Sequence, residues 1–257
     1  MNIDFNVDNL SVKIYNNRVE LGVAAAGDVI ARIRELLAKQ KFVNVIFAAA
    51  PSQNEFLAEL RENTLEWNRV RAFHMDEYIG LDGNDPQRFG NFLDENIFGK
   101  LPFLAIHYLN GSAKDEVEEC NRYNGLLKIY PVDIVCMGIG ENGHMAFNDP
   151  PVADFKDPQL VKVVELEAAC RQQQVNDGCF ASIDEVPVKA ITLTIPALMA
   201  AKFIFCMVPG ATKATAVYNT LNMEIIEQYP ATVIRTHANA ALYLDELSAS
   251  KLPKQTV

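Results

Sequence analysis

The chain has few cysteines, and their spacing excludes the patterns of disulfide-rich proteins and of cysteine-bound metal sites. There are five of them, an odd number, and no two form a Cys-x-x-Cys pair. Such usage is typical of reduced thiols, so we expect a cytoplasmic protein without a disulfide framework. Cys136 and Cys206 lie inside apolar runs and are expected in the core.

Membrane-spanning segments and a surplus of positive charge are also missing. No apolar run approaches the length of a transmembrane helix, and the N-terminus lacks the basic and apolar regions of a signal peptide. Lysine and arginine total 23 against 33 aspartates and glutamates, which gives a formal net charge of −10. A nucleic-acid-binding protein would show a basic face, so we expect neither a nucleic acid nor a membrane as partner.

Internal repeats, low-complexity segments and linkers are absent as well. Hydrophobic residues make up 49% of the sequence and charged residues 22%, which excludes a disordered or fibrous chain. A length of 257 residues allows a sizeable core and lies within the range of one α/β domain. We therefore expect residues 1–257 to form a single domain.

Apolar runs typical of buried strands alternate with amphipathic helical patterns after an irregular start. Strands are predicted at 43–50, 70–75, 132–137, 160–166, 191–195, 203–208 and 240–244, and helices over about 20–40, from 52 onward, over 117–130 and over about 212–223. This alternation predicts the α/β class, with a doubly wound, mainly parallel, Rossmann-like sheet and helices on both faces. The functional site of such a fold lies across the carboxyl ends of the strands.

A glycine-rich loop follows the predicted strand at 132–137. Gly138 and Gly140 let a ligand come close to the main chain, so they are substrate-binding candidates. His144 is the one histidine of four that follows the predicted central strand. Acidic and amide side chains crowd the same loop, namely Glu141, Asn142, Asn148 and Asp149. This setting suits general acid–base chemistry at an imidazole.

Two other interpretations of this loop were weighed against acid–base chemistry. The segment 138–143 matches the GxGxxG fingerprint of dinucleotide binding, but that motif requires a helix that starts at the loop. Pro150 and Pro151 would interrupt such a helix within two turns, and Glu141 would place a negative charge beside the phosphates. A purely structural turn would leave the crowding of polar groups around His144 unexplained.

Two predicted helix starts carry candidate phosphate ligands. Ser52 and Glu55 have the spacing of a capping box, and the turn formed by Ser52, Gln53 and Asn54 could seat a phosphate on backbone N–H groups. An ordinary capped helix is the alternative there. Lys213 lies at a helix N-terminus, where a lysine is unfavourable unless it shares an anion, so a phosphate ligand is favoured over a surface charge.

The predicted strand at 70–75 delivers His74, Asp76 and Glu77 into one loop. These groups could suggest a metal site, but the two-histidine helical spacing of a zinc hydrolase is absent, and we expect no metal. A solvated acidic turn and a positioned carboxylate base remain. We count Asp76 as a catalytic candidate and Glu77 as a substrate-binding one.

Four segments together resemble the glucosamine-6-phosphate deaminase/isomerase family, within the wider group of sugar-phosphate isomerases and 6-phosphogluconolactonases. They are FHMDEYIGL at 73–81, GIGENGHMAFNDP at 138–150, GATK at 210–213 and PATVIRTH at 230–237. The resemblance implies an enzyme of amino sugar and carbohydrate metabolism. Its reaction would isomerise a 6-phosphorylated amino sugar with loss of ammonia, as in glucosamine 6-phosphate to fructose 6-phosphate, without a cofactor or catalytic metal.

The resemblance also implies roles for three residues. Asp76 matches the aspartate that moves the proton between C2 and C1 of the open-chain sugar. His144 matches the histidine that assists opening of the pyranose ring. Lys213 matches the lysine that binds the phosphate.

The sequence departs from the family pattern beside the histidine and at the phosphate. An aspartate and a glutamate that flank the family's histidine are replaced by Asn142 and Asp149. Either Glu141 or Asp149 supplies the charge that orients His144, or ring opening is weakened. We expect Asp149 to supply it. The glycine/threonine-rich phosphate loop is replaced by APSQN at 50–54, and the phosphate-clamping arginine falls near Asn176. Arg171 is the nearest guanidinium to that position.

Three hypotheses follow from the sequence. A deaminase or isomerase of an amino sugar phosphate is favoured because Asp76 and His144 are both present. A sugar-phosphate lactone hydrolase shares the fold and the histidine loop but has no use for Asp76 as a carbon base. A non-catalytic phosphosugar-binding regulator would fit Asn142 and the altered phosphate loop. The sugar epimer, allosteric control and the formation of a homo-oligomer stay open.

Overall fold

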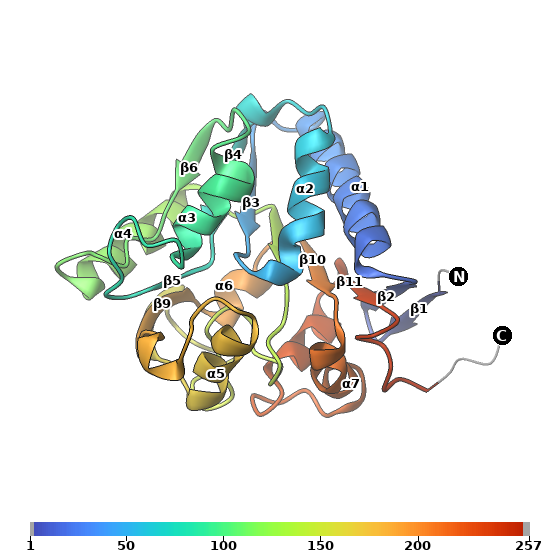
Figure 1. Ribbon diagram of the computed structural model, residues 1–257. Coiled ribbons are helices and arrows are strands. Elements are labelled where there is room, and N and C mark those ends of the chain that lie inside the picture. Colours follow the sequence, from blue (N-terminus) through green and yellow to red (C-terminus); the bar gives the residue numbers. More distant parts are fainter. Residues whose placement is uncertain (1–2, 254–257) are drawn as a thin grey trace.

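An eight-stranded sheet forms the centre of the computed structural model, which describes residues 3–253 (Figure 1). The strand order is β1-β2-β11-β10-β7-β3-β4-β6. These strands are β1 (Ile3–Val7), β2 (Leu10–Tyr15), β3 (Val43–Phe47), β4 (Val70–His74), β6 (Ala105–His107), β7 (Ile134–Met137), β10 (Phe203–Val208) and β11 (Ala240–Asp245). β1 and β2 pair antiparallel at one edge, and the other neighbouring pairs are parallel.

A smaller antiparallel sheet lies beyond the carboxyl end of β4. Its order is β5 (Asp76–Tyr78), β9 (Lys189–Leu193) and β8 (Val161–Glu165). Only Met75 separates β4 from β5, so the chain passes from the large sheet to the small one at that residue. Asp76 is thereby held at the end of a central strand and paired with Thr192 of β9.

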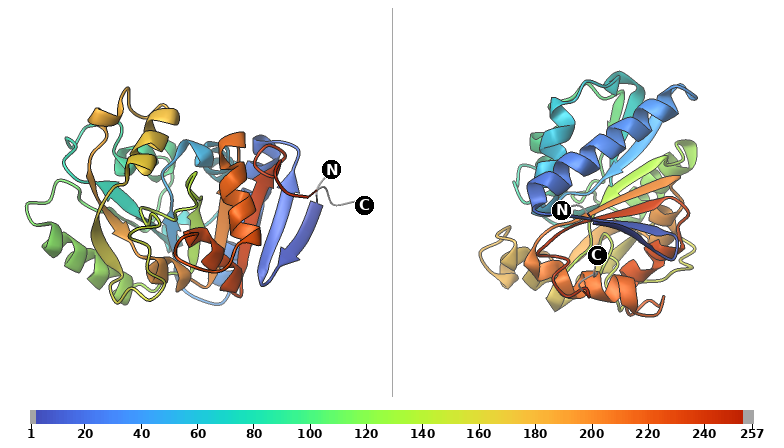
Figure 2. Two further views of the ribbon diagram at one scale, coloured as in Figure 1. Left: turned by 90° about the horizontal axis from the view of Figure 1, so that it is seen from below. Right: turned by 90° about the vertical axis from the view of Figure 1, so that its right-hand side faces the viewer.

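Helices cover both faces of the large sheet, with α1 and α2 on one face and α4 and α7 on the other (Figure 2). The helices are α1 (Arg18–Leu37), α2 (Asn54–Glu62), α3 (Phe89–Leu93), α4 (Glu116–Ile129), α5 (Ala168–Asn176), α6 (Ile195–Met199) and α7 (Ala214–Asn222). Shorter helical turns are η1 (Pro51–Gln53), η2 (Trp67–Arg69), η3 (Asp94–Phe98), η4 (Ile183–Glu185), η5 (Ala211–Lys213) and η6 (Pro230–Thr236). Within residues 3–253, none of these is both long and apolar enough to cross a membrane.

The two faces of the sheet build separate cores because side chains alternate along each strand. In β7, Ile134 and Cys136 belong to the core beneath α1 and α2, whereas Val135 and Met137 belong to the core beneath α4 and α7. All four side chains are at most 1% exposed, as expected for a central strand of a parallel sheet. The predicted doubly wound α/β architecture is confirmed.

The order of the strands reverses between β3 and β7, which are neighbours in the sheet. From β3 the chain moves outward to β4 and β6, then returns to β7 and continues through β10 and β11 on the other side. Ligands of open α/β sheets bind in the crevice at such a switch point. β3 ends at Phe47 rather than at the predicted Ala50, which leaves residues 48–50 free to line that crevice.

The irregular start predicted for the chain is wrong, because residues 3–15 form the β1–β2 hairpin. Apolar and polar residues alternate through IDFNV and LSVKIY with a period of two, which is the pattern of a half-buried strand. Asp8, at the turn between them, has a φ of 51°, in the left-handed region that aspartate tolerates.

The capping box predicted at Ser52 and Glu55 does not form. Ser52 lies in η1, α2 begins at Asn54, and neither start has a side-chain cap. Glu55 does not reach back because its carboxylate accepts two hydrogen bonds from Arg18, at 2.6 and 2.8 Å. An interaction between residues far apart in the sequence therefore replaces the local one.

Candidate active site

A cavity of about 260 Å³ lies at the carboxyl ends of the central strands. Four strand ends contribute to its wall, namely residues 48–52 after β3, 75–76 after β4, 138–140 after β7 and 209–213 after β10. The remaining wall residues are Arg18, Phe89, His144, Ala146, Phe147, Gln173, Gln174 and Asp177. The site thus lies where the reversal of strand order places it.

Two glycines shape the loop that carries His144. Gly143 has a φ of +84°, a conformation that L side chains rarely adopt. A Cβ on Gly140 would lie 2.1–2.5 Å from ring atoms of His144, closer than any real contact. Only a glycine at position 140 therefore lets the imidazole lie against the loop. Gly138 and Gly140 both line the cavity, as expected for sites of close ligand approach.

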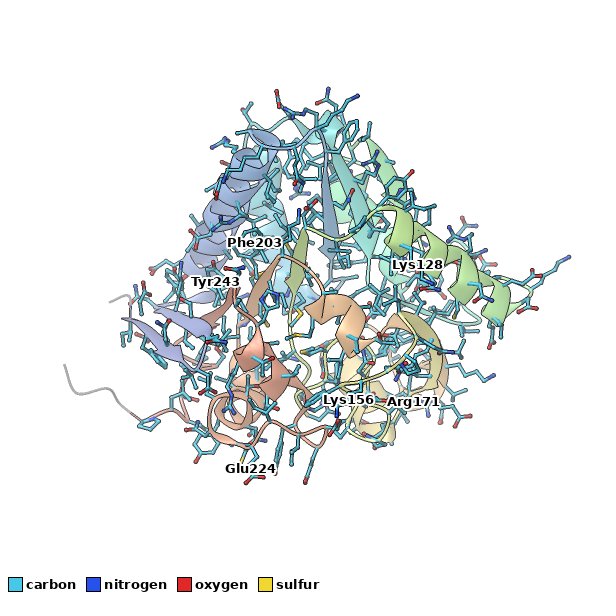
Figure 3. The ribbon with its side chains drawn as sticks, turned by 180° about the vertical axis from the view of Figure 1, so that it is seen from behind. Lys128, Lys156, Arg171, Phe203, Glu224 and Tyr243 are labelled. Atoms are coloured by element: carbon cyan, nitrogen blue, oxygen red, sulfur yellow. The ribbon has the colours of Figure 1, made fainter. Side chains whose placement is uncertain are left out.

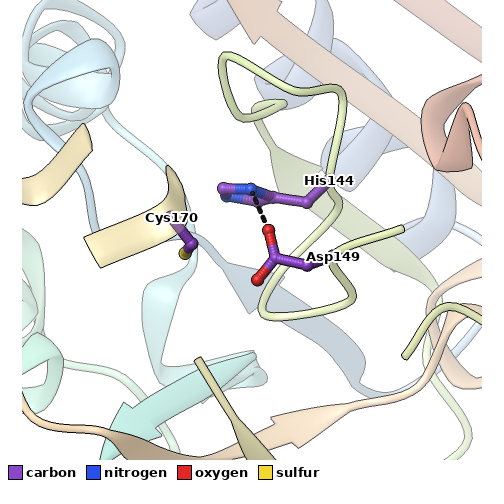
Figure 4. A group of neighbouring side chains, drawn as sticks. All are labelled: His144, Asp149 and Cys170. Atoms are coloured by element: carbon purple, nitrogen blue, oxygen red, sulfur yellow. Dashed lines mark ion pairs between the residues drawn. The ribbon is translucent and has the colours of Figure 1, made fainter. Parts of the chain in front are cut away.

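The imidazole of His144 is held by two side chains of its own loop. Nδ1 lies 2.8 Å from Asn142 Oδ1 and 3.0 Å from Asp149 Oδ1 (Figure 4). Both oxygens are acceptors, so Nδ1 carries a proton, and in the neutral ring Nε2 has the lone pair. The amide of Asn142 can face only this way, because its Oδ1 accepts from the backbone N–H of His144 at 3.0 Å and its Nδ2 donates to Asp149 Oδ1 at 2.8 Å.

Asp149 is fully buried, yet its surroundings favour the carboxylate. Burial acts to raise the pKa, but the hydrogen bond and charge of His144 and the Asn142 amide hold the pKa of Asp149 below its ordinary value. Glu141, the other candidate partner, does not bind the ring: its backbone N–H donates to Gln173 Oε1 at 2.8 Å, and its buried Oε1 has no hydrogen-bond partner among the described residues. Of the two acidic neighbours, Asp149 is the one in contact with the ring.

Asp76 lines the same cavity in a different environment. Its side chain is buried, with a relative exposure of 7%, and among residues 3–253 its carboxyl oxygens have no hydrogen-bond or ion-pair partner. Burial, and next the charge of Glu77, raise the pKa of Asp76 well above its ordinary value. A carboxyl in this state is a strong base once ionised and holds the proton that it takes up.

Lys213 brings a positive charge to the wall formed after β10. Its side chain is 6% exposed, and its ammonium has no ion-pair partner among the described residues. Burial lowers the pKa of Lys213, although the charges of Asp177 and Glu141 act in the opposite direction. An isolated buried ammonium is unfavourable without a counter-ion, so this part of the cavity suits an anionic ligand.

Two helix starts add backbone donors to the cavity wall. The turns η1 and η5 lead into α2 and α7, and none of the four has a side-chain cap. Uncapped N–H groups and the helix dipole favour an anion. Ser52 lines the cavity, and its Oγ accepts a hydrogen bond from Gln53 Nε2 at 3.1 Å. Gln53 does not line the cavity and supports Ser52 from behind.

Glu77 does not line the cavity, contrary to its selection as a substrate ligand. It is fully buried, and its carboxylate accepts hydrogen bonds from the backbone N–H groups of Phe89 at 3.1 Å and Gly90 at 3.0 Å. The reason is local, because Asp76 and Glu77 are successive residues of β5 and point to opposite sides of the strand. Glu77 therefore anchors the segment that brings Phe89 to the cavity.

Arg171 and Asn54 also lie away from the cavity. Arg171 belongs to the gold segment around α5 in Figure 3, and its guanidinium donates to the backbone carbonyls of Ile183 and Val186. It is therefore occupied in holding η4 to α5 and does not replace the missing phosphate-clamping arginine. Asn54 is exposed at the first turn of α2.

One face of α5 and an arginine of α1 were not predicted as parts of the site. Gln173 and Gln174 of α5 and the following Asp177 line the cavity, and Cys170 packs on the same side near Asp149. The spacing of these four positions, i, i+3, i+4 and i+7, is that of one helix face and was a usable signal. Arg18 also lines the cavity, but its pairing with Glu55 has no local sequence signal.

A metal-capable group exists at this site and not at 74–77. Across the described residues, His144, Asp149 and Cys170 are grouped with ligand atoms within 4.8 Å of one another. His74 instead accepts a hydrogen bond at Nε2 from the N–H of Leu109 at 2.6 Å, and burial lowers its pKa to about 3. His74 and Glu77 thus serve the fold.

The fold and the site together define an α/β protein equipped for proton transfer on an anionic ligand. The sequence profile of the glucosamine-6-phosphate isomerases/6-phosphogluconolactonase family matches residues 16–243. The chain belongs to this family, as the four motifs predicted.

The similar proteins include glucosamine-6-phosphate deaminases and 6-phosphogluconolactonases. The glucosamine-6-phosphate deaminase of Bacillus cereus (strain G9842) is 37% identical over 218 residues, which cover 85% of this chain and 81% of that protein. The solved structure of a monomeric glucosamine-6-phosphate deaminase is 29% identical in sequence and has a TM-score of 0.85. The match covers 93% of this chain and 98% of that protein's chain. The 6-phosphogluconolactonase of Trypanosoma brucei has a TM-score of 0.78 over 94% and 98% of the two chains, but its identity of 18% shows a likeness of fold alone.

Proposed function

We propose that the protein is a glucosamine-6-phosphate deaminase, which converts the amino sugar phosphate and water to fructose 6-phosphate and ammonia. Two buried carboxyl groups carry the proposal: Asp76, which lines the cavity and has a raised pKa, and Asp149, which contacts His144 of the cavity wall and has a lowered one. Environments that drive two pKa values apart mark different acid–base roles. Hydrolysis of a lactone moves no carbon-bound proton, so it gives Asp76 no comparable task.

Ring opening falls to His144. Its Nε2 takes the proton of the C1 hydroxyl as the bond between C1 and the ring oxygen breaks, and the imidazole then returns a proton to that oxygen. Asp149 stabilises the imidazolium formed on the way, because its carboxylate lies 3.0 Å from Nδ1. Asn142 keeps the ring in this orientation through its amide oxygen.

Isomerisation falls to Asp76. Its carboxylate takes the proton from C2 of the open-chain aldose and delivers it to C1, while one proton of the sugar's ammonium group passes to O1. The double bond between C1 and O1 is thereby replaced by one between C2 and nitrogen. Water then adds to C2, and ammonia leaves to give the ketose. A carboxyl group buried without hydrogen-bond partners is basic enough for the first step and acidic enough for the second.

The phosphate is proposed to lie between Lys213 and the two uncapped helix starts. Lys213 supplies the charge, and the two turns supply the Ser52 hydroxyl and the backbone N–H groups of Ser52, Ala211 and Thr212. This arrangement supports phosphate binding without the arginine of the family pattern, because charged hydrogen bonds at a helix N-terminus are strong.

An assay of product release tests the proposal. The purified protein is offered glucosamine 6-phosphate, its 2-epimer and 4-epimer, unphosphorylated glucosamine and 6-phosphogluconolactone, and ammonia and ketose phosphate are measured. We expect equal amounts of the two products from at least one phosphorylated amino sugar and none from glucosamine at the same concentration. Lactone hydrolysis without ammonia release from any amino sugar would contradict the proposal.

A further inference from the structure

We propose that His144, Asp149 and Cys170 form a binding site for a thiophilic divalent cation such as Zn²⁺, and that the bound cation blocks the active site. In the proposed deamination Cys170 takes no proton and contacts no substrate, and its thiol only helps to lower the pKa of Asp149. The inference goes beyond the proposed deamination, because binding of the cation is measurable without any sugar.

The three side chains converge from two separate segments. His144 and Asp149 belong to the loop after β7, and Cys170 belongs to the first turn of α5. Their ligand atoms lie within 4.8 Å of one another. Zinc bonds of about 2.0–2.3 Å in tetrahedral geometry place ligand atoms about 3.3–3.8 Å apart, so a contraction of about 1 Å completes the site. A small rotation of the Cys170 side chain provides such a movement.

The second carboxylate oxygen of Asp149 faces this group. Asp149 Oδ1 is bonded to His144 and Asn142, whereas Oδ2 is buried and meets no donor in good hydrogen-bond geometry among the described residues. Figure 4 shows this second oxygen on the side where the Cys170 thiol lies, and the thiol interacts with the carboxylate. A thiol is a weak donor, so a cation bound between the two groups would satisfy the buried oxygen better.

The donor set selects the kind of cation. One imidazole nitrogen, one carboxylate oxygen and one sulfur suit zinc or cobalt, whereas Mg²⁺ and Ca²⁺ prefer oxygen alone. Binding releases the thiol proton to solvent, and the proton on His144 Nδ1 moves to Nε2, so that the ring stays neutral. The thiolate and the carboxylate then balance the two positive charges.

A cation bound by His144, Asp149 and Cys170 would prevent His144 from acting as the base in ring opening. Coordination at Nδ1 replaces the hydrogen bonds of the imidazole to Asn142 and Asp149, and Nε2, which then carries the ring proton, can no longer accept one from the sugar. His144 lines the cavity, so water or a ligand atom can reach a fourth position from there. Inhibition by zinc that a chelator reverses follows from this geometry.

The test uses Co²⁺ as a spectroscopic probe on the full-length protein freed of metal with a chelator. We expect one Co²⁺ per chain, a near-ultraviolet thiolate-to-cobalt charge-transfer band, and loss of the band when Zn²⁺ is added. Cys170→Ser should abolish the band and weaken zinc binding, measured by calorimetry, at least about tenfold. Cys179→Ser is the matched control, because this half-buried thiol follows the same helix but lies outside the group, and it should keep the band.

Two results would overturn the inference: no charge-transfer band in the wild type, or a band that persists in Cys170→Ser. If circular dichroism shows that Cys170→Ser is unfolded, Asp149→Asn serves instead. That variant keeps the thiol and should also lose at least about tenfold in zinc affinity. Unchanged affinity in a folded Asp149→Asn protein would equally contradict the site.

Discussion

Two buried carboxyl groups in one site, Asp76 at the end of β4 and Asp149 in the loop after β7, have opposite surroundings. Asp149 is bonded to His144 and Asn142, and these partners hold its pKa low. Asp76 has no such partner within residues 3–253, and burial raises its pKa. The comparison teaches that equal burial does not mean equal chemistry, because the hydrogen-bond partners decide which form of the carboxyl is stable.

The largest effect is expected when the base itself is removed. Asp76→Asn should lower kcat by about 10²- to 10⁴-fold, because general base catalysis is lost while the shape of the side chain is kept. Binding of the phosphorylated sugar, measured by calorimetry, should stay near that of the wild type. Asp177→Asn, at another cavity carboxylate, is the control and should lose much less. Turnover near the wild-type rate in Asp76→Asn would end the assignment.

The second substitution changes the other carboxyl. Asp149→Asn should lower kcat on the cyclic sugar by about 10- to 150-fold, the scale of one charged hydrogen bond of about 1.5–3 kcal/mol. A substrate trapped in the open-chain form should be affected much less, since only ring opening depends on the tuned imidazole. Equal losses on both substrates would show that Asp149 serves the shape of the site or the C2 proton transfer.

The third substitution concerns Lys213, which is proposed to bind the phosphate and has no part in the proton transfers of Asp76 and His144. Lys213→Ala should weaken binding of the phosphorylated sugar by about 1.5–3 kcal/mol and leave the fold intact. Lys202→Ala is the control, because this exposed lysine pairs with Asp133 and does not line the cavity. If affinity for an unphosphorylated analogue falls equally, Lys213 does not bind the phosphate.

Asn142 donates a hydrogen bond to Asp149, so we expect that the aspartate of the family pattern would lower activity at position 142 of this chain. Asn142→Asp should raise the activation free energy of the reaction by about 1–3 kcal/mol and so slow turnover. The reason is that a donor 2.8 Å from the Asp149 carboxylate becomes a second negative charge. Adding Asp149→Glu, which restores the family pair, should recover part of the loss. Kinetics of the two single variants and the double variant form the test, and strictly additive losses would contradict the coupling.

The smallest effects concern the free energy of unfolding. At pH 8 we expect Asp76→Asn to raise it and Asp149→Asn to lower it. The raised pKa of Asp76 in the folded state means that its contribution to stability is present below its ordinary pKa and is lost as pH rises through the raised value. Asp76→Asn should therefore exceed the wild type in free energy of unfolding at pH 8. For Asp149 the pKa is lowered, so its contribution is present above its ordinary pKa and is lost as pH falls.

Urea unfolding at pH 4, 6 and 8 measures these differences. The gap between Asp76→Asn and the wild type should close toward pH 4. Asp149→Asn should instead be less stable than the wild type at all three pH values, because the contribution of Asp149 is lost only below its ordinary pKa of 3.8. Gaps of the same sign for both variants would contradict the difference in their surroundings.

Sequence patterns were sufficient to locate site residues at the ends of strands. They were insufficient to predict the direction in which each side chain points. Asp76, His144 and Lys213 could be found because parallel strands bring their carboxyl ends to one edge, and the cavity lies there. Glu77 was misplaced because residues 76–78 were interpreted as a loop. As a strand, the same residues would have predicted one side chain toward the cavity and the next away from it.

Contacts between distant segments account for the remaining differences. The Ser52–Glu55 capping box looked complete, but Arg18 of α1 takes the glutamate, and no local pattern shows this. The polar face of α5 had the correct spacing for a helix but no sign of which element it would pack against. Gln173, which holds the backbone of Glu141, becomes part of the site only through that packing.

The most direct test of the division of labour follows two events in Asp76→Asn with bound glucosamine 6-phosphate. Exchange nuclear magnetic resonance measures interconversion of the sugar anomers, which requires ring opening, and the same sample in deuterated water reports transfer of the C2 hydrogen. The account predicts that the variant still accelerates anomer exchange above the spontaneous rate but no longer moves the C2 hydrogen. Loss of both processes together, or retention of C2 hydrogen transfer, would contradict it.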